Sequence, residues 1–352
     1  MDATVRFATA LRPRVDKLAR TLGRTPHIAV HAPSLGLAFE AGDAEQPFHS
    51  ASVAKLVTAA LVMQCVEADG LTTATPVGDV LPAAEIDGLF LPGPPATVEH
   101  LLTHTSGVAD YFDGKVTTGV PVVREALAHP QRQWTPADLI AVTRERQRPV
   151  GAPGQRFAYS DTGFVLLGRI LEQVTGESFV DLVHQRVFDP IGLTSAFWPH
   201  RSQPASGVTE LAPLVLRGVD ASTFPSMTLD WAAGGFAATA ADHLRLGAAL
   251  HDGTLVSAES MAYMTTPRHR VLPGLEYGAG AMRLRVERFV PWLRGYPRPV
   301  GHIGVTAAHL WHDPATGADI VINLGNTRRM VTSFRLLFRI LGELRTLTQR
   351  SG

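Results

Sequence analysis

The signals for β-strands lie towards the two ends of this chain, and a long helix-rich stretch separates them. Residues 27–33 and 36–42 read as strands, and strand signals return at 277–286, 301–313 and 318–326. Strands and helices do not alternate regularly between these segments, which argues against a doubly wound parallel sheet. We therefore predict an α+β fold with an antiparallel sheet, flanked by N-terminal and C-terminal helices and carrying an inserted helical domain.

The domain organisation follows from this distribution. Residues 1–70 and 244–352 are predicted to form the sheet domain, and 71–243 the helical insert, with the site in the cleft between them. Amphipathic helices are expected near both termini, because apolar residues recur there at helical spacing. Capping residues, prolines and glycines mark further helices at about 135–147, 160–174, 178–187 and 242–250. The tryptophans Trp231, Trp292 and Trp311 are expected in the core.

Composition excludes several classes of function. The 352 residues carry 32 Lys+Arg against 32 Asp+Glu, so the chain has no electrostatic footprint for nucleic acid or an anionic membrane. Cys65 is the single cysteine, and no internal disulfide can form. The N-terminus lacks the apolar core of a signal peptide, and the apolar run at 56–66 is too short to span a bilayer. We expect a cytoplasmic protein with no nucleic-acid or membrane partner.

The apolar run at 56–66 begins directly after Ser52-Val53-Ala54-Lys55. A serine and a lysine three residues apart lie on one face of a helix, close enough to share a proton. The first N–H groups of a helix lack partners and stabilise negative charge that develops there. Ser52 is therefore a candidate nucleophile, although a capping serine beside a solvated lysine would give the same pattern.

Two further patterns carry possible chemistry. Tyr159-Ser160-Asp161 opens a predicted helix, where a tyrosine hydroxyl could carry a proton or simply pack. His302-Ile303-Gly304 lies in a strand-like segment, and its glycine would let a ligand approach the backbone and the N–H of Val305. A histidine in a strand is more often structural, so neither pattern decides a function alone.

The three patterns in this order resemble the serine β-lactamase and penicillin-binding-protein superfamily. Tyrosine in the second motif and histidine in the third look most like its branch of class C β-lactamases, D-alanyl-D-alanine carboxypeptidases and esterases. The resemblance extends over nearly the whole chain. It includes the segments 101–107, 153–168, 190–193 and 233–235.

The resemblance implies an acyl-enzyme mechanism. Ser52 attacks a carbonyl, Lys55 and Tyr159 move its proton, the N–H groups of Ser52 and Val305 hold the oxyanion, and water completes hydrolysis. Whether Lys55 or Tyr159 is the base stays open. The resemblance also places other residues at the substrate: Tyr111, Asp161, His302 and Gly304.

The second motif departs from the commonest pattern of this branch, which is Tyr-x-Asn. An ionised aspartate only accepts hydrogen bonds, whereas an asparagine amide also donates them. We hypothesise that Asp161 pairs with Lys55 and weakens recognition of the side-chain amide of a β-lactam. Histidine in place of Lys-Thr-Gly in the third motif also favours an esterase or peptidase.

These patterns favour a serine hydrolase of small esters or amides, first of all a carboxylesterase. A D-amino-acid-specific peptidase or amidase comes second and a β-lactamase third. An acyltransferase or a non-catalytic ligand-binding module stays open, as does the oligomeric state. We expect no cofactor and no metal, because His100 and His104 share a helical spacing but have no evident third ligand.

Overall fold

A computed structural model of the protein describes residues 2–289 and 293–351. Its main sheet has eight antiparallel strands in the order β2-β1-β12-β11-β10-β9-β8-β7. Strand β1 (His27–Ala32) lies between β2 (Leu37–Ala41) and β12 (Ala318–Asn323), so segments from the two ends of the chain pair directly. The predicted antiparallel sheet is confirmed.

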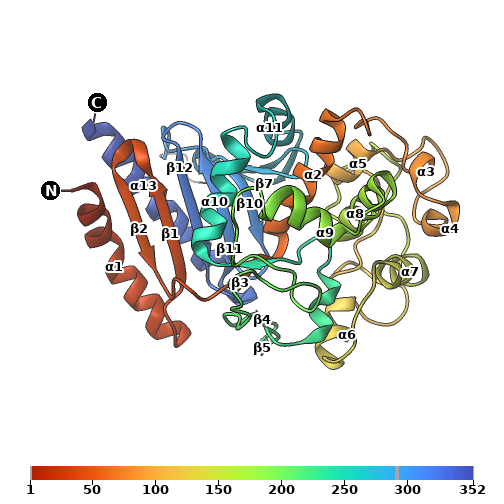
Figure 1. Ribbon diagram of the computed structural model, residues 1–352, viewed down its shortest axis with the longest axis horizontal. Coiled ribbons are helices and arrows are strands. Elements are labelled where there is room, and N and C mark those ends of the chain that lie inside the picture. Colours follow the sequence, from red (N-terminus) through yellow and green to blue (C-terminus); the bar gives the residue numbers. More distant parts are fainter. Residues whose placement is uncertain (1, 290–292, 352) are drawn as a thin grey trace.

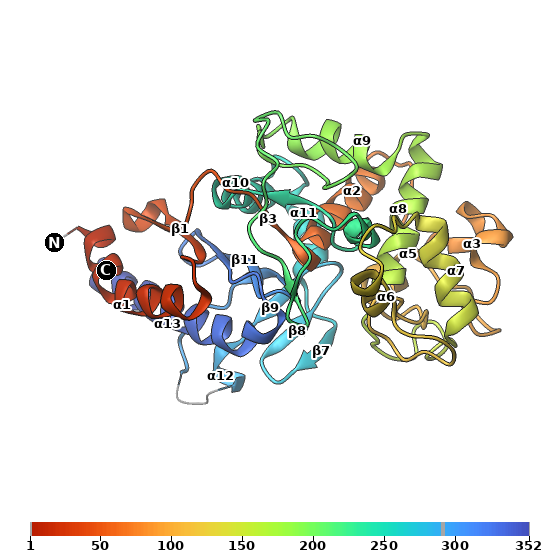
Figure 2. The ribbon, with the colours of Figure 1, turned by 90° about the horizontal axis from the view of Figure 1, so that it is seen from below.

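Helices cover both faces of this sheet (Figures 1 and 2). Helix α1 (Ala3–Leu22) lies beside α13 (Met330–Ser351) on one face, and α10 (Ala240–His251) covers β1, β11 and β12 on the other. The stripe expected near the N-terminus buries Leu11 and Val15 of α1. Apolar side chains of α13 join them against the sheet, including Leu337, Ile340 and Leu341. Burial of these stripes, more than helix propensity, stabilises the two terminal helices.

The C-terminal strands are more finely divided than the sequence indicates. The segment 301–313 is a hairpin of β10 (Val300–Gly304) and β11 (Ala308–Asp313), not one strand. The segment 277–286 is likewise divided, into β8 (Leu275–Tyr277) and β9 (Met282–Leu284). Neither turn has the Asn-Gly or Asp-Gly signal of a tight hairpin, and Ala307 takes the left-handed conformation at φ +61°. The edge strand β7 (His269–Leu272) was not predicted.

The inserted region is mainly helical. Its capped helices agree with the sequence: Thr135 and Asp138 form a capping box at α7, and Ser160 caps α8. Its helices are α3 (Val77–Val80), α4 (Ala83–Ile86), α5 (Val98–Leu102), α6 (Val122–Ala128), α7 (Pro136–Arg146), α8 (Asp161–Thr175) and α9 (Phe179–Val183). The remaining elements are the pairs β3 (Phe48–His49) with β6 (Ala237–Ala238) and β4 (Val215–Leu216) with β5 (Val219–Asp220), α11 (Ala258–Thr265) and α12 (Val286–Phe289).

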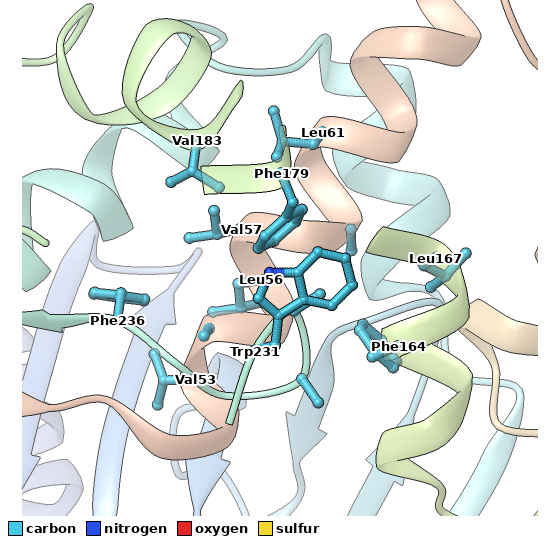
Figure 3. Close-up of a cluster of buried hydrophobic side chains, with 14 of the residues drawn as sticks. Val53, Leu56, Val57, Leu61, Phe164, Leu167, Phe179, Val183, Trp231 and Phe236 are labelled. Atoms are coloured by element: carbon cyan, nitrogen blue, oxygen red, sulfur yellow. The ribbon is translucent and has the colours of Figure 1, made fainter. Parts of the chain in front are cut away.

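Helix α2 (Lys55–Glu67) lies at the centre of the larger apolar core and is buried on nearly every side. Figure 3 shows Trp231 and Phe179 against its first turns, with Phe164 of α8 alongside. Trp231 and Trp311 are buried, as predicted, and Trp292 lies outside the described residues. Among the described helices, none has the length and apolar character needed to cross a bilayer. The tight packing fixes the start of α2, directly after the turn that carries the candidate nucleophile.

Candidate active site

Ser52 lies on a short 3-10 turn (Ala51–Ala54) that leads into α2. The preceding Ala51 has φ +48°, a left-handed conformation that a non-glycine residue adopts at a cost of roughly 1 kcal/mol or more. Neighbouring hydrogen bonds hold this turn: Ser50 Oγ donates to the Phe236 carbonyl at 2.7 Å, and the Ala51 N–H donates to His49 Nδ1 at 3.1 Å. The strained residue thus lies directly before the nucleophile, and hydrogen bonds with Phe236 and with His49 of β3 hold it in place.

Lys55 is fully buried, and three oxygens surround its amine. Lys55 Nζ lies 3.2 Å from Ser52 Oγ, 2.5 Å from the Ala233 carbonyl and 2.6 Å from Asp161 Oδ1. A lysine ammonium has three N–H donors, so this set accounts for all three. The hypothesised pairing of Asp161 with Lys55 is present as a buried ion pair.

Tyr159 comes from the loop that enters α8, and its hydroxyl is hydrogen-bonded to Ser52. Its ring centroid lies 5.0 Å from Lys55 Nζ and 4.1 Å from the ring centroid of His104. Burial, and then the charge of Asp161, raise the pKa of Tyr159 well above its usual value, while the hydrogen bond with Ser52 lowers it. The resting tyrosine is therefore a neutral phenol. The first two sequence motifs therefore meet at Ser52, Lys55 and Tyr159.

The end of β10 packs directly against the nucleophile turn. A Cβ on Gly304 would lie 2.6 Å from Ala51 Cβ and 3.3 Å from the Ser52 nitrogen, so only glycine allows this approach. Val305 follows in the turn, lines the cavity beside Ser52 and is 43% exposed. Its N–H donates no hydrogen bond to the described residues. The backbone here can therefore offer a donor to a developing oxyanion, as in other acyl-transfer sites.

His302 lies behind the site rather than in it. The ring is fully buried, with Nδ1 2.9 Å from the Ile303 carbonyl and Nε2 3.4 Å from Tyr277 Oη. Tyr277 Oη also lies 3.0 Å from His104 Nε2, and His104 Nδ1 accepts from the Ser160 N–H at 3.1 Å. We call His104, Tyr277 and His302 the rear wall.

The partners of the rear wall fix the direction of its hydrogen bonds. His104 Nδ1 accepts a bond, so its Nε2 carries the proton and donates to Tyr277. His302 Nδ1 donates to a carbonyl, so its Nε2 accepts from the Tyr277 hydroxyl. Burial, and then Lys55, lower the pKa of both histidines, that of His302 to about 3. Both rings are therefore neutral and satisfied.

A cavity of about 160 Å³ opens at Ser52. Its lining contains four carboxylates together with Ala51, Ser52, Phe112, Tyr159 and Val305. Those carboxylates are Asp110, Asp113, Asp161 and Asp230. The cavity lining does not include three residues expected at the substrate: His302, Gly304 and Tyr111, whose hydroxyl instead donates to the Leu229 carbonyl at 2.8 Å.

The buried carboxylates of the cavity repel one another. Burial, and then the charge of Asp161, raise the pKa of both Asp110 and Asp230 above the usual value. Backbone N–H groups of Asp161, Asp113 and Phe112 donate to Asp110 and partly oppose its shift. Asp230 accepts no hydrogen bond from the described residues, and the charge of Lys55 partly opposes its shift. His49 Nε2 lies 3.9 Å from its carboxylate, and burial lowers the pKa of that histidine to about 4.

A family model described as Beta-lactamase matches residues 38–332. The chain belongs to the beta-lactamase family. Members of this family are serine hydrolases, which confirms the predicted family resemblance and the assignment as an enzyme.

Curated relatives in the family include a penicillin-binding protein 4 of Amycolatopsis lactamdurans, 36% identical over 42% of this chain and 34% of the relative. A lovastatin esterase of Penicillium rubens is 32% identical over 42% of this chain and 39% of the relative. This chain thus matches well under half of the length of either protein. A solved D-stereospecific amidohydrolase from a Streptomyces species is 23% identical, with a TM-score of 0.75 over 92% of this chain and 97% of that one. Its similarity shows the shared fold.

The sequence did not predict three residues at or behind this site: Tyr277, Asp110 and Asp230. Asp110 lies three residues after the recognised 101–107 segment, and Asp230 three residues before the recognised 233–235 segment. Their positions next to recognised motifs were the available signal. Tyr277 had no such signal, because its partners come from segments that are distant in sequence.

Proposed function

We propose that the protein hydrolyses small carboxylic esters and amides through an acyl-enzyme on Ser52. The observation that carries the proposal is the contact of one hydroxyl with an amine and a phenol at the mouth of a cavity: Ser52 with Lys55 at 3.2 Å and with Tyr159. A serine is a weak nucleophile until a neighbouring group accepts its proton. This arrangement supplies two neighbouring proton carriers.

The proposed reaction balances without any cofactor. Attack requires the form of the site in which Lys55 is a neutral amine: Ser52 Oγ bonds to the carbonyl carbon while its proton passes to Lys55 Nζ, either directly or through the Tyr159 hydroxyl, which gives up one proton as it takes up another. The carbonyl oxygen becomes an oxyanion between the N–H groups of Ser52 and Val305, each donor being worth about 3–4 kcal/mol of barrier. Collapse breaks the bond to the leaving group, which takes up the proton. Water then attacks the acyl-enzyme by the same steps and releases the acid and Ser52.

The size of the cavity favours a short acyl group. Its 160 Å³ holds about five water molecules, whereas drug-sized ligands occupy roughly 300 Å³ or more. Asp161 is ion-paired with Lys55 and only accepts hydrogen bonds. It therefore cannot donate to the side-chain amide of a β-lactam, as an asparagine at this position would. We therefore propose short-chain esters and small amides ahead of β-lactams as substrates.

A short series of p-nitrophenyl esters, from acetate to octanoate, tests this function. We expect turnover that falls with chain length, complete loss in Ser52→Ala, and an intact-mass adduct that maps to Ser52. Ser222→Ala is the matched control, because that hydroxyl makes none of the hydrogen bonds described and does not line the cavity. Hydrolysis by Ser52→Ala at the parent rate, or the absence of both turnover and adduct in the parent, would overturn the proposal.

A further inference from the structure

A groove of about 300 Å³ lies between the terminal helices α1 and α13, which run side by side (Figure 2). Four cationic side chains line it, Arg14, Lys17, Arg329 and Arg335, and no carboxylate does among the described residues. It shares no lining residue with the cavity at Ser52. The chain as a whole is neutral, so positive charge is concentrated locally in this cationic groove.

The charge of the cationic groove is not compensated by its neighbours. Within the part of the chain that the structure describes, none of the four cations has an ion pair or a side-chain hydrogen bond. Arg14 and Lys17 are three residues apart on α1, a spacing at which like charges repel each other. An anion in the groove would therefore relieve repulsion as well as gain attraction.

Arg329 gives independent evidence, because its side chain is partly buried. Its Nε is shielded from solvent and has no hydrogen-bond partner among the described residues. A buried carboxylate without a partner can take up a proton, whereas a guanidinium stays charged. Arg329 thus carries a partly desolvated charge that no anion offsets, which is unfavourable. An anion bound to the outer N–H groups of this guanidinium would offset that charge.

The position of these side chains in α13 points the same way. Arg329 directly precedes this 22-residue helix, where the helix dipole favours anions and disfavours cations. The first turn of α13 contains no acidic residue. Thr332 lies in that turn, lines the groove and has a hydroxyl that takes part in none of the hydrogen bonds described. The helix dipole and this hydroxyl would both stabilise an anion that the arginines bind.

We propose that the cationic groove binds a small molecule through a phosphate or pyrophosphate group, with Arg329 and Arg335 on one side and Arg14 and Lys17 on the other. Guanidinium groups match phosphate oxygens with paired hydrogen bonds. A phosphate monoester carries about −1.5 to −2 charges at pH 7, so it offsets more of the groove than a carboxylate does. The volume of the groove is at the lower end of the range for small-ligand pockets, which favours a small phosphorylated molecule over a membrane surface.

Binding of inorganic pyrophosphate to the full chain tests the proposal, by isothermal titration calorimetry at constant ionic strength. We expect one saturable site with a Kd below about 1 mM. Arg329→Gln should raise the Kd by about tenfold or more, because it removes charge-assisted hydrogen bonds, and Arg335→Gln should act in the same direction. Pyrophosphate should also raise the Tm of the parent more than that of Arg329→Gln, which shows at the same time that the variant is folded.

Arg12→Gln is the matched control, because it removes the same charge from an exposed arginine of α1 outside the groove lining. Its Kd should equal that of the parent. No saturable binding in the parent would overturn the proposal. An equal loss of affinity in Arg12→Gln and Arg329→Gln would also overturn it, since net charge alone would then attract the anion.

A lipid headgroup could supply the same phosphate chemistry, so a second arm uses vesicles of equal parts phosphatidylcholine and phosphatidylglycerol. Binding to these vesicles without binding of pyrophosphate would overturn the proposal in favour of a membrane surface. Binding of pyrophosphate without binding to the vesicles would support it. None of these measurements depends on ester turnover, so the hydrolase function proposed above is tested separately.

Discussion

The two sides of Ser52 are built on opposite principles. On one side the rear wall of His104, Tyr277 and His302 is buried, neutral and linked by hydrogen bonds of defined direction. On the other side the cavity has carboxylates that repel each other, with Asp230 lacking any hydrogen bond from the described residues. Lys55 lies between the two and touches Ser52 and Asp161.

This contrast separates the residues that stabilise the site from those that face the substrate. A fully satisfied polar network rigidifies its surroundings, and here it links the loop of Tyr159, the strand β8 and the strand β10. A cluster of carboxylates with too few cations nearby contributes little to the stability of the fold, and an added cation stabilises it most. Stability and recognition thus depend on residues on opposite sides of Ser52.

The largest expected effect on activity comes from removing the positive charge of Lys55, which lies between the rear wall and the carboxylates of the cavity. Lys55→Met leaves the Ser52 hydroxyl without its amine contact and Asp161 without its ion pair. We expect kcat to fall by about 10²–10⁴ for every ester, since a positioned proton carrier contributes this much. Steady-state kinetics on p-nitrophenyl acetate measure it, with the exposed Lys17→Met as control. An unchanged kcat would remove Lys55 from the reaction.

The rear wall is tested next by Tyr277→Phe. The variant keeps the ring but leaves the Nε2 atoms of His104 and His302 without their hydroxyl partner. Each unsatisfied buried group costs about 1–3 kcal/mol, so the free energy of unfolding should drop by that order. We expect kcat to fall, because the Tyr159 ring packs against His104 with 4.1 Å between ring centroids, while KM changes little. Urea unfolding and steady-state kinetics measure the two effects.

Tyr296→Phe supplies the reference for that experiment, because the Tyr296 ring packs against Arg345 and its hydroxyl takes no part in the hydrogen bonds of the rear wall. If Tyr277→Phe matched this control in both stability and kcat, the rear wall would have no role beyond packing.

Much of the fold could be predicted because its signals are local. The capping box of Thr135 and Asp138 and the cap at Ser160 each fix a helix start within a few residues of sequence. The sheet could be inferred from strand signals at both ends. The hairpin turn at 305–307 could not, because Val305, Thr306 and Ala307 include no glycine, proline, asparagine or aspartate to mark it, although Ala307 adopts a left-handed conformation.

The residues of the site also differ in how well sequence could predict them. Ser52 and Lys55 lie one helical turn apart, so sequence spacing alone brings them together. Asp110 and Asp230 are 120 positions apart, and their shared cavity exists only in the folded chain. Sequence also placed His302 at the substrate, whereas its hydrogen bonds to Tyr277 and Ile303 hold it behind the site. A motif shows which residues matter but not which wall they join.

A smaller effect is expected from Asp161→Asn, which changes the charge of the cavity lining but not its shape. The substitution breaks the ion pair with Lys55 and supplies an amide that can donate to a substrate carbonyl. We expect a several-fold rise in turnover of a penicillin or a cephalosporin, followed spectrophotometrically. Unchanged or lower β-lactam kinetics would contradict the view that Asp161 restricts this class of substrate.

The smallest effect concerns stability and sharpens the contrast between the walls. Folding raises the pKa of Asp230, so the native state retains a proton that the unfolded state has already lost. Stability therefore falls as pH rises above about 4, the usual pKa of an aspartate, and the penalty is complete above the native pKa. Asp230→Asn removes this titration. Its free energy of unfolding should exceed that of the parent by about 1 kcal/mol at pH 8, with little difference at pH 4.

The rear wall should respond to pH with the opposite sign. Burial lowers the pKa of His302 to about 3, so the unfolded chain binds a proton first as pH falls below about 6.5. Stability contributed by the neutral ring is thus present above that pH and is lost on acidification. Urea unfolding of the parent, Asp230→Asn and the exposed control Asp87→Asn from pH 4 to 8 separates the two walls. The difference in free energy of unfolding between Asp230→Asn and the parent should grow as pH rises. The free energy of unfolding of both proteins should itself fall towards acidic pH. A difference independent of pH would show that Asp230 is compensated by a partner, and the two walls would then not differ in kind.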